Sequence, residues 1–152
     1  MSAFGIEVNE DAVRLFSESV GKHDALDILI NAMSDSESIL DREAFRQAVH
    51  EREAIMSTGI GSGIAIPHVR IEQVLRPIVG IGISQSGIDF GTLDDEPVHI
   101  VVLFAMPAGS QKEYLNLLAQ VMLALKQPGF REELLACQTP TEVAAALNRP
   151  DA

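Results

Sequence analysis

Hydrophobic side chains in the first third of the chain recur at helical spacing. Within residues 22–33 they return every three or four positions, and this period predicts an amphipathic helix. Asp41 precedes a second segment of the same period over residues 44–49 and can cap its first turn, which predicts another helix. Ahead of both, residues 12–16 alternate weakly and predict a short strand.

The middle of the chain changes to short apolar runs. Residues 64–66, 77–83 and 98–106 are predicted strands, and the last run is apolar enough to be buried on both faces of a sheet. Pro67 ends the first of these runs. Residues 57–63 are predicted as a loop, because three of them are glycines, which tolerate backbone angles that other residues avoid.

Helical spacing returns in the last third. A long helix is predicted over residues 110–126, and Pro128 ends it. A short helix follows, and a final one opens at Thr139, at Thr141 or at the proline between them. Helices at both ends and strands in the middle predict an α/β sandwich. The 152 residues fit one domain, residues 1–152, although the strand order cannot be read from the pattern.

Charge and composition exclude several classes of protein. Eleven Lys and Arg residues against 22 Asp and Glu residues give a net charge of −11, which argues against binding to nucleic acid or to an anionic membrane surface. No signal peptide opens the sequence and no apolar stretch is long enough to span a membrane, so we expect a cytoplasmic protein without membrane insertion. The single cysteine, Cys137, forms no internal disulfide and is expected to be a small buried thiol.

Few residues are candidates for chemistry. The glycine-rich residues 59–63 lack the Lys-Ser/Thr ending of a nucleotide-binding loop and do not open a helix, and no Cys/His group has zinc-ligand spacing. Of the four histidines, His23 and His50 are interpreted as surface residues, and His99 as an exposed strand end. His68 differs, because a glycine loop, a short strand and a rigid proline precede it and can hold its side chain at the end of a sheet.

The run from residue 51 to residue 68, EREAIMSTGIGSGIAIPH, closely resembles the signature of the enzyme IIA domains of the bacterial phosphotransferase system, in their fructose/mannitol and nitrogen-related class. Weaker resemblance extends over about residues 12–148. It implies a mixed α/β/α sandwich: a small mixed sheet flanked by helices. It also implies a phosphocarrier that takes a phosphoryl group on His68 from the phosphohistidine of an HPr-like protein and passes it on, typically to a IIB domain. No metal or other cofactor is implied, because the donor is already an activated phosphohistidine.

The resemblance also implies roles for other residues. Arg52, sixteen positions before His68, would stabilise the phosphoryl group through its planar guanidinium, and Arg70 is a weaker candidate for the same task. Support from backbone amides would come from a further set of residues. This set comprises Gly59, Gly61, Ser62 and Gly63.

The chain departs from the family pattern at one important position. Family members commonly carry a second active-site histidine in the long helix, and the matching residue here is Tyr114, or Asn116 if the alignment is shifted. Tyrosine can donate a hydrogen bond but does not readily carry positive charge. Two hypotheses follow: a phosphotransferase component of the nitrogen-related branch, or a regulatory module that controls a transporter or kinase with phosphotransfer weak or lost. The sequence shows no fused IIB or membrane segment, which favours the nitrogen-related branch over a sugar permease.

Overall fold

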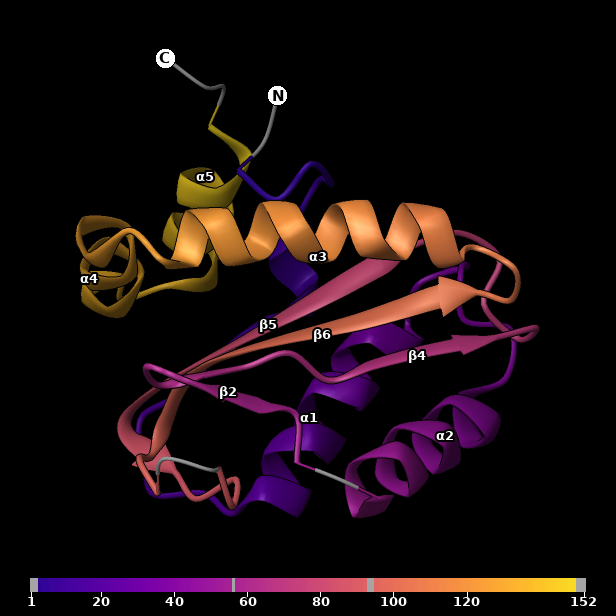
Figure 1. Ribbon diagram of the computed structural model, residues 1–152, viewed down its shortest axis with the longest axis horizontal. Coiled ribbons are helices and arrows are strands. Elements are labelled where there is room, and N and C mark those ends of the chain that lie inside the picture. The colour runs from indigo at the N-terminus through magenta and orange to yellow at the C-terminus, as the bar shows by residue number, and fades with distance from the viewer. Residues whose placement is uncertain (1–2, 56, 93–94, 150–152) are drawn as a thin grey trace.

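The computed structural model describes residues 3–55, 57–92 and 95–149, and it has three layers, with a mixed sheet between two sets of helices (Figure 1). The strands are β1 (Val13–Phe16), β2 (Gly59–Gly61), β3 (Ile64–Ala65), β4 (His68–Ile71), β5 (Ile78–Ile88) and β6 (Val98–Pro107). The helices are α1 (Lys22–Ser34), α2 (Arg42–Ile55), α3 (Gln111–Leu125), α4 (Pro128–Ala136) and α5 (Pro140–Asn148), with a 3₁₀ turn, η1 (Glu10–Ala12), before β1.

The sheet is built around the long antiparallel pair β5 and β6. Its order is β1-β5-β6-β3-β2, and β4 also pairs with β6. Strand β1 runs parallel to β5, and β3 and β4 run parallel to β6, whereas β2 is antiparallel to β3. The predicted mixed α/β/α sandwich is therefore confirmed, and the strand order, which the sequence pattern left open, is now defined.

Strands β3 and β4 lie one after the other along the same edge of β6. Ile64 pairs with Ile100 and His68 pairs with Phe104, so the same offset holds on both sides of Pro67. The two strands thus form one path that is interrupted at Pro67, which has no N–H to donate to the ladder. Because side chains alternate between the faces of a strand, Ile64, Ile66 and His68 project to the same face.

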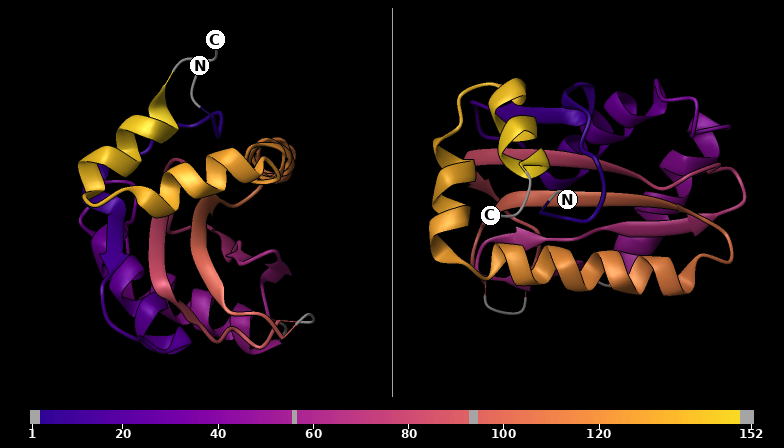
Figure 2. Two further views of the ribbon diagram at one scale, coloured as in Figure 1. Left: turned by 90° about the vertical axis from the view of Figure 1, so that its left-hand side faces the viewer. Right: turned by 90° about the horizontal axis from the view of Figure 1, so that it is seen from above.

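Each face of the sheet carries its own hydrophobic core. Helices α1 and α2 cover one face, and helices α3, α4 and α5 cover the other (Figure 2). Ile64 and Ile66 belong to the core under α3, whereas Ala65 and Val69 belong to the core under α1 and α2. This alternation places His68 on the α3 side of the sheet.

Most predicted elements are confirmed, and their caps explain where they begin. Asp41 accepts a hydrogen bond from the Ala44 amide at 3.1 Å and caps α2, as predicted. Thr139 does the same for the Glu142 amide at 3.1 Å, and so decides where α5 opens. Pro128 both ends α3 and supplies the first turn of α4, where its missing N–H is not needed.

The region between α2 and β5 differs from the prediction. Residues 57–63 are not simply a loop, since β2 begins at Gly59 and forms a hairpin with β3. Ser62 and Gly63 make its turn with positive φ angles of 57° and 78°, as tight hairpin turns require. Strand β4 was not predicted, because its polar residues His68 and Arg70 do not read as a buried run.

None of the described helices combines the length with the apolar composition that crossing a bilayer would require.

Candidate functional site

His68 is the first residue of β4 and follows Pro67, at which the path of β3 and β4 along β6 is interrupted. Its Nδ1 lies 3.2 Å from the carbonyl oxygen of Ile66, two residues earlier. A carbonyl oxygen only accepts hydrogen bonds, so Nδ1 carries the hydrogen and donates it. The lone pair of the neutral ring is therefore on Nε2, which makes Nε2 the nucleophilic atom.

Tyr114 packs directly against this ring from the first turns of α3. The two ring centroids are 4.6 Å apart and the ring planes are inclined by 27°, which is a stacked arrangement. Tyr114 is buried, whereas Asn116 is exposed and lines a different hollow with Gly5 and Gln120. Of the two candidates for the position beside His68, the structure brings only Tyr114 to it.

Two arginines approach from different elements. Arg52 lies in the last turn of α2 and lines the same pocket as His68. Arg70 follows His68 by two residues on the same face of β4, and its guanidinium carbon is 5.8 Å from the centre of the Tyr114 ring. The positive charges of both arginines act on the His68 imidazole and disfavour its protonated form.

The environment keeps His68 uncharged. Its pKa is lowered first by burial, which penalises the protonated ring, and further by the positive charges of Arg52 and Arg70. The hydrogen bond to Ile66 and the charge of Glu53 oppose this shift without reversing it. Burial raises the pKa of Tyr114, although both arginines oppose the increase, so its phenol stays protonated at neutral pH.

A pocket of about 620 Å³ opens beside His68 between α3 and the segment that follows α2. Its walls are largely apolar, and both His68 and Arg52 contribute to its lining. It is lined by Arg52, Ser57, Thr58, Gly59, Ile60, Ile66, His68, Gly91, Tyr114, Leu118 and Met122.

The glycine-rich segment contributes to this pocket through only one of its proposed phosphate-binding residues. Gly59 lines the pocket, but Gly61, Ser62 and Gly63 belong to the β2–β3 hairpin and are absent from its lining. A side chain added at Gly63 would meet His99, at the start of β6, at 3.4 Å. The structure therefore does not bring these three residues to His68.

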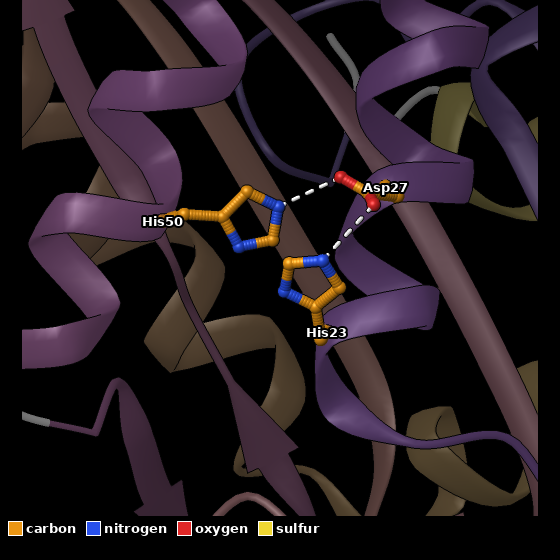
Figure 3. A group of neighbouring side chains, drawn as sticks. All are labelled: His23, Asp27 and His50. Carbon is orange, nitrogen blue, oxygen red and sulfur yellow. Dashed lines mark hydrogen bonds and ion pairs between the residues drawn. The ribbon is translucent and has the colours of Figure 1, made fainter.

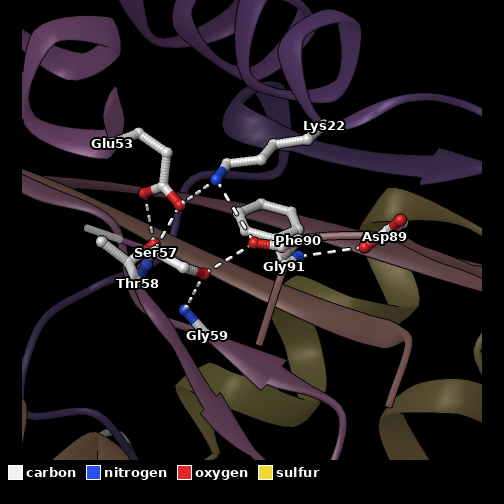
Figure 4. A network of polar contacts seen from close by, with 8 residues as sticks. All are labelled: Lys22, Glu53, Ser57, Thr58, Gly59, Asp89, Phe90 and Gly91. Carbon is white, nitrogen blue, oxygen red and sulfur yellow. Dashed lines mark hydrogen bonds and ion pairs between the residues drawn. The ribbon is translucent and has the colours of Figure 1, made fainter. Parts of the chain in front are cut away.

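A buried ionic network that the sequence pattern does not predict holds the wall of the pocket in place (Figure 4). The Glu53 carboxylate accepts hydrogen bonds from the backbone amide and the hydroxyl of Thr58, at 3.0 and 2.6 Å, and pairs with Lys22 Nζ at 2.6 Å. Ser57 Oγ donates to the Phe90 carbonyl at 2.7 Å. One signal was available in the sequence: Glu53 continues the buried stripe of Phe45 and Val49 at intervals of four residues.

The other histidines and the cysteine differ in part from their predicted surroundings. His23 is exposed, as predicted, but His50 is half-buried and bonds to Asp27 at 2.7 Å. His99 is half-buried as well, and its Nδ1 donates to the Ser84 carbonyl at 2.8 Å. Cys137 is only partly buried, because it follows the last turn of α4, where its thiol donates to the Glu133 carbonyl at 3.4 Å.

Comparison with known proteins places this site in a family. Residues 8–149 match the family described as the phosphoenolpyruvate-dependent sugar phosphotransferase system, EIIA 2. The chain is 32% identical over 126 residues to the PTS system fructose-specific EIIA component of Haloferax volcanii, covering 83% of this chain and 82% of that protein. It is 30% identical over 137 residues to the nitrogen regulatory protein of Escherichia coli, covering 90% and 83%. It is also 30% identical over 144 residues to the fructose-specific EIIABC component of Bacillus subtilis, matching 95% of this chain but only 23% of that larger protein.

Solved structures give the same result. The nitrogen regulatory protein IIA-Ntr from Neisseria meningitidis superposes with a TM-score of 0.82 at 25% identity, covering 93% of this chain and 96% of that one. IIA mannitol from Escherichia coli shares the fold, with a TM-score of 0.76 at 20% identity over 93% and 99% of the two chains. The chain therefore belongs to the type 2 EIIA family of the phosphoenolpyruvate-dependent sugar phosphotransferase system, whose members are phosphotransferases.

Proposed function

We propose that the protein is a phosphocarrier that accepts a phosphoryl group on Nε2 of His68. The observation that carries this proposal is the state of the ring: Nδ1 is engaged by the Ile66 carbonyl, the pKa is lowered, and Nε2 is left with the lone pair. A neutral, oriented imidazole of this kind attacks phosphorus without a separate base. The donor would be the phosphohistidine of an HPr-like carrier protein.

The transfer exchanges one phosphorus–nitrogen bond for another. The Nε2 lone pair of His68 forms a bond to phosphorus, while the bond to the donor's ring breaks and returns its electron pair to that ring. If the second nitrogen of the donor ring is protonated, that ring leaves as neutral imidazole, so no proton passes between the proteins. The hydrogen on His68 Nδ1 stays on that nitrogen in the phosphorylated ring and is still donated to the Ile66 carbonyl oxygen.

Arg52 and Arg70 would stabilise the charge that the phosphoryl group brings. The transferring group has its negative charge spread over three oxygens, so catalysis depends on positioning and on nearby cations. Arg52 lines the pocket and Arg70 lies above the Tyr114 ring, so the two guanidinium groups approach from different elements. Tyr114, stacked on His68, would restrict the rotation of the imidazole and hold Nε2 in place.

The relatives suggest partners for this chain. One solved neighbour is the complex of enzyme IIA mannitol with phosphorylated enzyme IIB mannitol from Escherichia coli, at 21% identity and a TM-score of 0.76. Several relatives are nitrogen regulatory proteins. We assign the chain to this nitrogen-related branch, with an HPr-like donor and either a IIB domain or a regulated transporter or kinase downstream.

The direct test is phosphorylation from phosphoenolpyruvate. The purified protein is incubated with enzyme I and HPr, or with their nitrogen-related counterparts, and its intact mass is measured. We expect a gain of one phosphoryl group on the parent and on His99→Gln, and no gain on His68→Gln. A gain that persists in His68→Gln would place the acceptor elsewhere, and no gain with any carrier would refute phosphotransfer.

A second candidate function is a regulatory module in which phosphotransfer is weak, and the observation favouring it is Tyr114. A tyrosine beside the acceptor cannot supply the positive charge that histidine offers to the phosphoryl group. A single-turnover experiment separates the two functions. Phosphorylated protein is mixed with a IIB domain and the decay of the phosphohistidine is followed. Rapid transfer supports the carrier, whereas a long-lived phosphohistidine that changes binding to a transporter or kinase supports the regulator.

A further inference from the structure

Two histidines and an aspartate converge on the face of the sheet opposite His68. His23 and Asp27 lie one turn apart on α1, and His50 reaches across from α2 (Figure 3). His50 Nε2 is 2.7 Å from Asp27 Oδ1, and His23 Nε2 is 3.3 Å from Asp27 Oδ2. The two imidazole rings stack with their centroids 4.2 Å apart. Both histidines therefore direct Nε2 at the Asp27 carboxylate from neighbouring positions.

We propose that His23, Asp27 and His50 form a binding site for a divalent transition-metal ion of the Zn²⁺ type. The three potential ligand atoms already lie within 4.8 Å of one another. A tetrahedral Zn²⁺ ion binds nitrogen and oxygen at about 2.0–2.2 Å, which sets its ligands roughly 3.3–3.6 Å apart, so only small shifts of the side chains are needed. Two imidazoles and one carboxylate are also a ligand set that Zn²⁺ accepts, with the fourth position left for water.

The side chains of this cluster suit an ion. The Asp27 carboxylate is hydrogen-bonded to His50 Nε2 at 2.7 Å and to Arg46 Nε at 3.0 Å, an arrangement that favours its ionised form. Each histidine would bind through Nε2 as the tautomer with its hydrogen on Nδ1, after exchange of that hydrogen with solvent. The His23 side chain is 65% exposed, which gives an ion a path into the site.

Arg46 is the group that competes with the ion. Its Nε lies 3.0 Å from Asp27 Oδ1 and its Nη2 3.3 Å from Oδ2, so it engages both carboxylate oxygens. The Arg46 side chain is 39% exposed, and a solvent-exposed ion pair of this kind holds its partners weakly. On binding, the ion would take one carboxylate oxygen, so Arg46 would lose at least one of its two hydrogen bonds, and its positive charge would lie close to the bound cation. Because the arginine must first release an oxygen, removing it should tighten metal binding.

The ion would join two helices that pack side by side on the sheet. His23 and Asp27 are on α1 and His50 is on α2, so a bound ion would cross-link the two helices. The free energy of unfolding would rise with the ion concentration relative to its dissociation constant. The site lies on the other face of the sheet from His68 and does not depend on phosphotransfer. The expectation that no metal is needed concerned phosphotransfer alone. The sequence showed no zinc-ligand spacing because one of the three ligands, His50, comes from another helix.

The test uses the full chain without a polyhistidine tag. Zn²⁺ binding is measured by titration calorimetry, and Co²⁺ is used as a spectroscopic probe whose visible absorption reports four-coordinate geometry. We expect one equivalent of Zn²⁺ to bind. Binding should weaken by more than about tenfold in each of His23→Gln, Asp27→Asn and His50→Gln, because even the removal of a group that only orients a ligand commonly costs about tenfold. Arg46→Met should bind more tightly than the parent.

Matched controls separate this site from adventitious binding by surface histidines. His68→Gln and His99→Gln each remove a histidine outside the cluster and should leave the stoichiometry and affinity unchanged. Urea unfolding of each variant without metal shows that the variant is folded. The proposal is overturned if no saturable binding is found, or if binding is unaffected by the His23 and His50 substitutions. It is also overturned if His68→Gln loses Zn²⁺ binding while the His23 and His50 variants keep it.

Discussion

The ion pair between Lys22 and Glu53 is the interaction whose removal should be felt most strongly beside the pocket. Glu53 is 6% exposed, and its carboxylate is held by Lys22 Nζ at 2.6 Å and by two hydrogen bonds from Thr58. Lys22→Met keeps the length of the aliphatic stem and removes the ammonium group with its charge and its hydrogen bonds. The lysine ammonium also lies 5.2 Å from the centre of the Phe90 ring and donates to the Phe90 carbonyl at 3.3 Å. In the variant, Glu53 would be a buried carboxylate without this cation.

The size of the loss follows from how the charge is buried. Removing one partner of a fully buried ion pair costs about 3–5 kcal/mol, because the other charge is left uncompensated. The Lys22 side chain is 27% exposed and Glu53 keeps its two bonds to Thr58, so we expect a smaller loss, about 2–3 kcal/mol. The double variant Lys22→Met/Glu53→Gln removes both charges and should lose less than the sum of the single variants.

Urea unfolding at neutral pH measures this loss. With a slope of about 1.5–2 kcal/mol per molar urea for a chain of this size, the midpoint should fall by roughly 1–2 M at unchanged slope. Arg149→Met, which removes an exposed pair with Glu133, serves as the control and should not move the midpoint measurably. If Lys22→Met loses less than about 0.5 kcal/mol, the pair is equivalent to an exposed one and the reasoning from burial fails.

Three further expectations follow from the site and the hairpin. The His68 pKa, followed by NMR of the ring nitrogens, should lie below the ordinary value of about 6.5, and a midpoint at or above 6.5 would contradict this. The contribution of His68 to the free energy of unfolding is therefore complete above about pH 6.5 and is lost as the pH falls through the lower folded-state pKa. Tyr114→Ala should cost about 2–4 kcal/mol in urea unfolding because it empties the space against His68, whereas Tyr114→Phe keeps the ring and should cost less than about 1 kcal/mol; equal losses would show that the ring contact is not what matters. Ser62→Asn should raise the free energy of unfolding by up to about 1 kcal/mol and Gly63→Ala should lower it by about 1–2 kcal/mol, because both positions have positive φ; a stabilising Gly63→Ala would refute this account of the turn.

The local pattern of the sequence was enough for most elements and for His68 as a candidate functional residue. Helices α1, α2 and α3 show their helical period directly, and β6 is apolar over most of its length. The run ending in Pro67 and His68 singled out one of four histidines as a candidate functional residue, and the family resemblance of residues 51–68 supplied its expected role as phosphoryl acceptor. These features were predictable because helical periodicity, capping and proline chemistry act between residues that are close in sequence.

Strand β4 and the buried role of Glu53 were not predictable to the same degree. Strand β4 exists because β6 offers a parallel edge in the same register that β3 already follows, although its own residues alternate between polar and apolar. Glu53 could be placed on the buried stripe of α2, but its partner Lys22 comes from another helix. Neither pairing is encoded by neighbours along the chain.

By itself, the sequence determined which segments become helices and most of the strands, the face that each presents, and the choice of His68 as the candidate acceptor. Only the tertiary structure decided what surrounds it: the Tyr114 ring stacked on His68, Arg52 in the pocket, and the meeting of Asp27 with His50 on the opposite face. The physical reason is range. Secondary structure follows from local periodicity and backbone preference, whereas these groups are brought together by the burial of two hydrophobic cores on the two faces of one sheet.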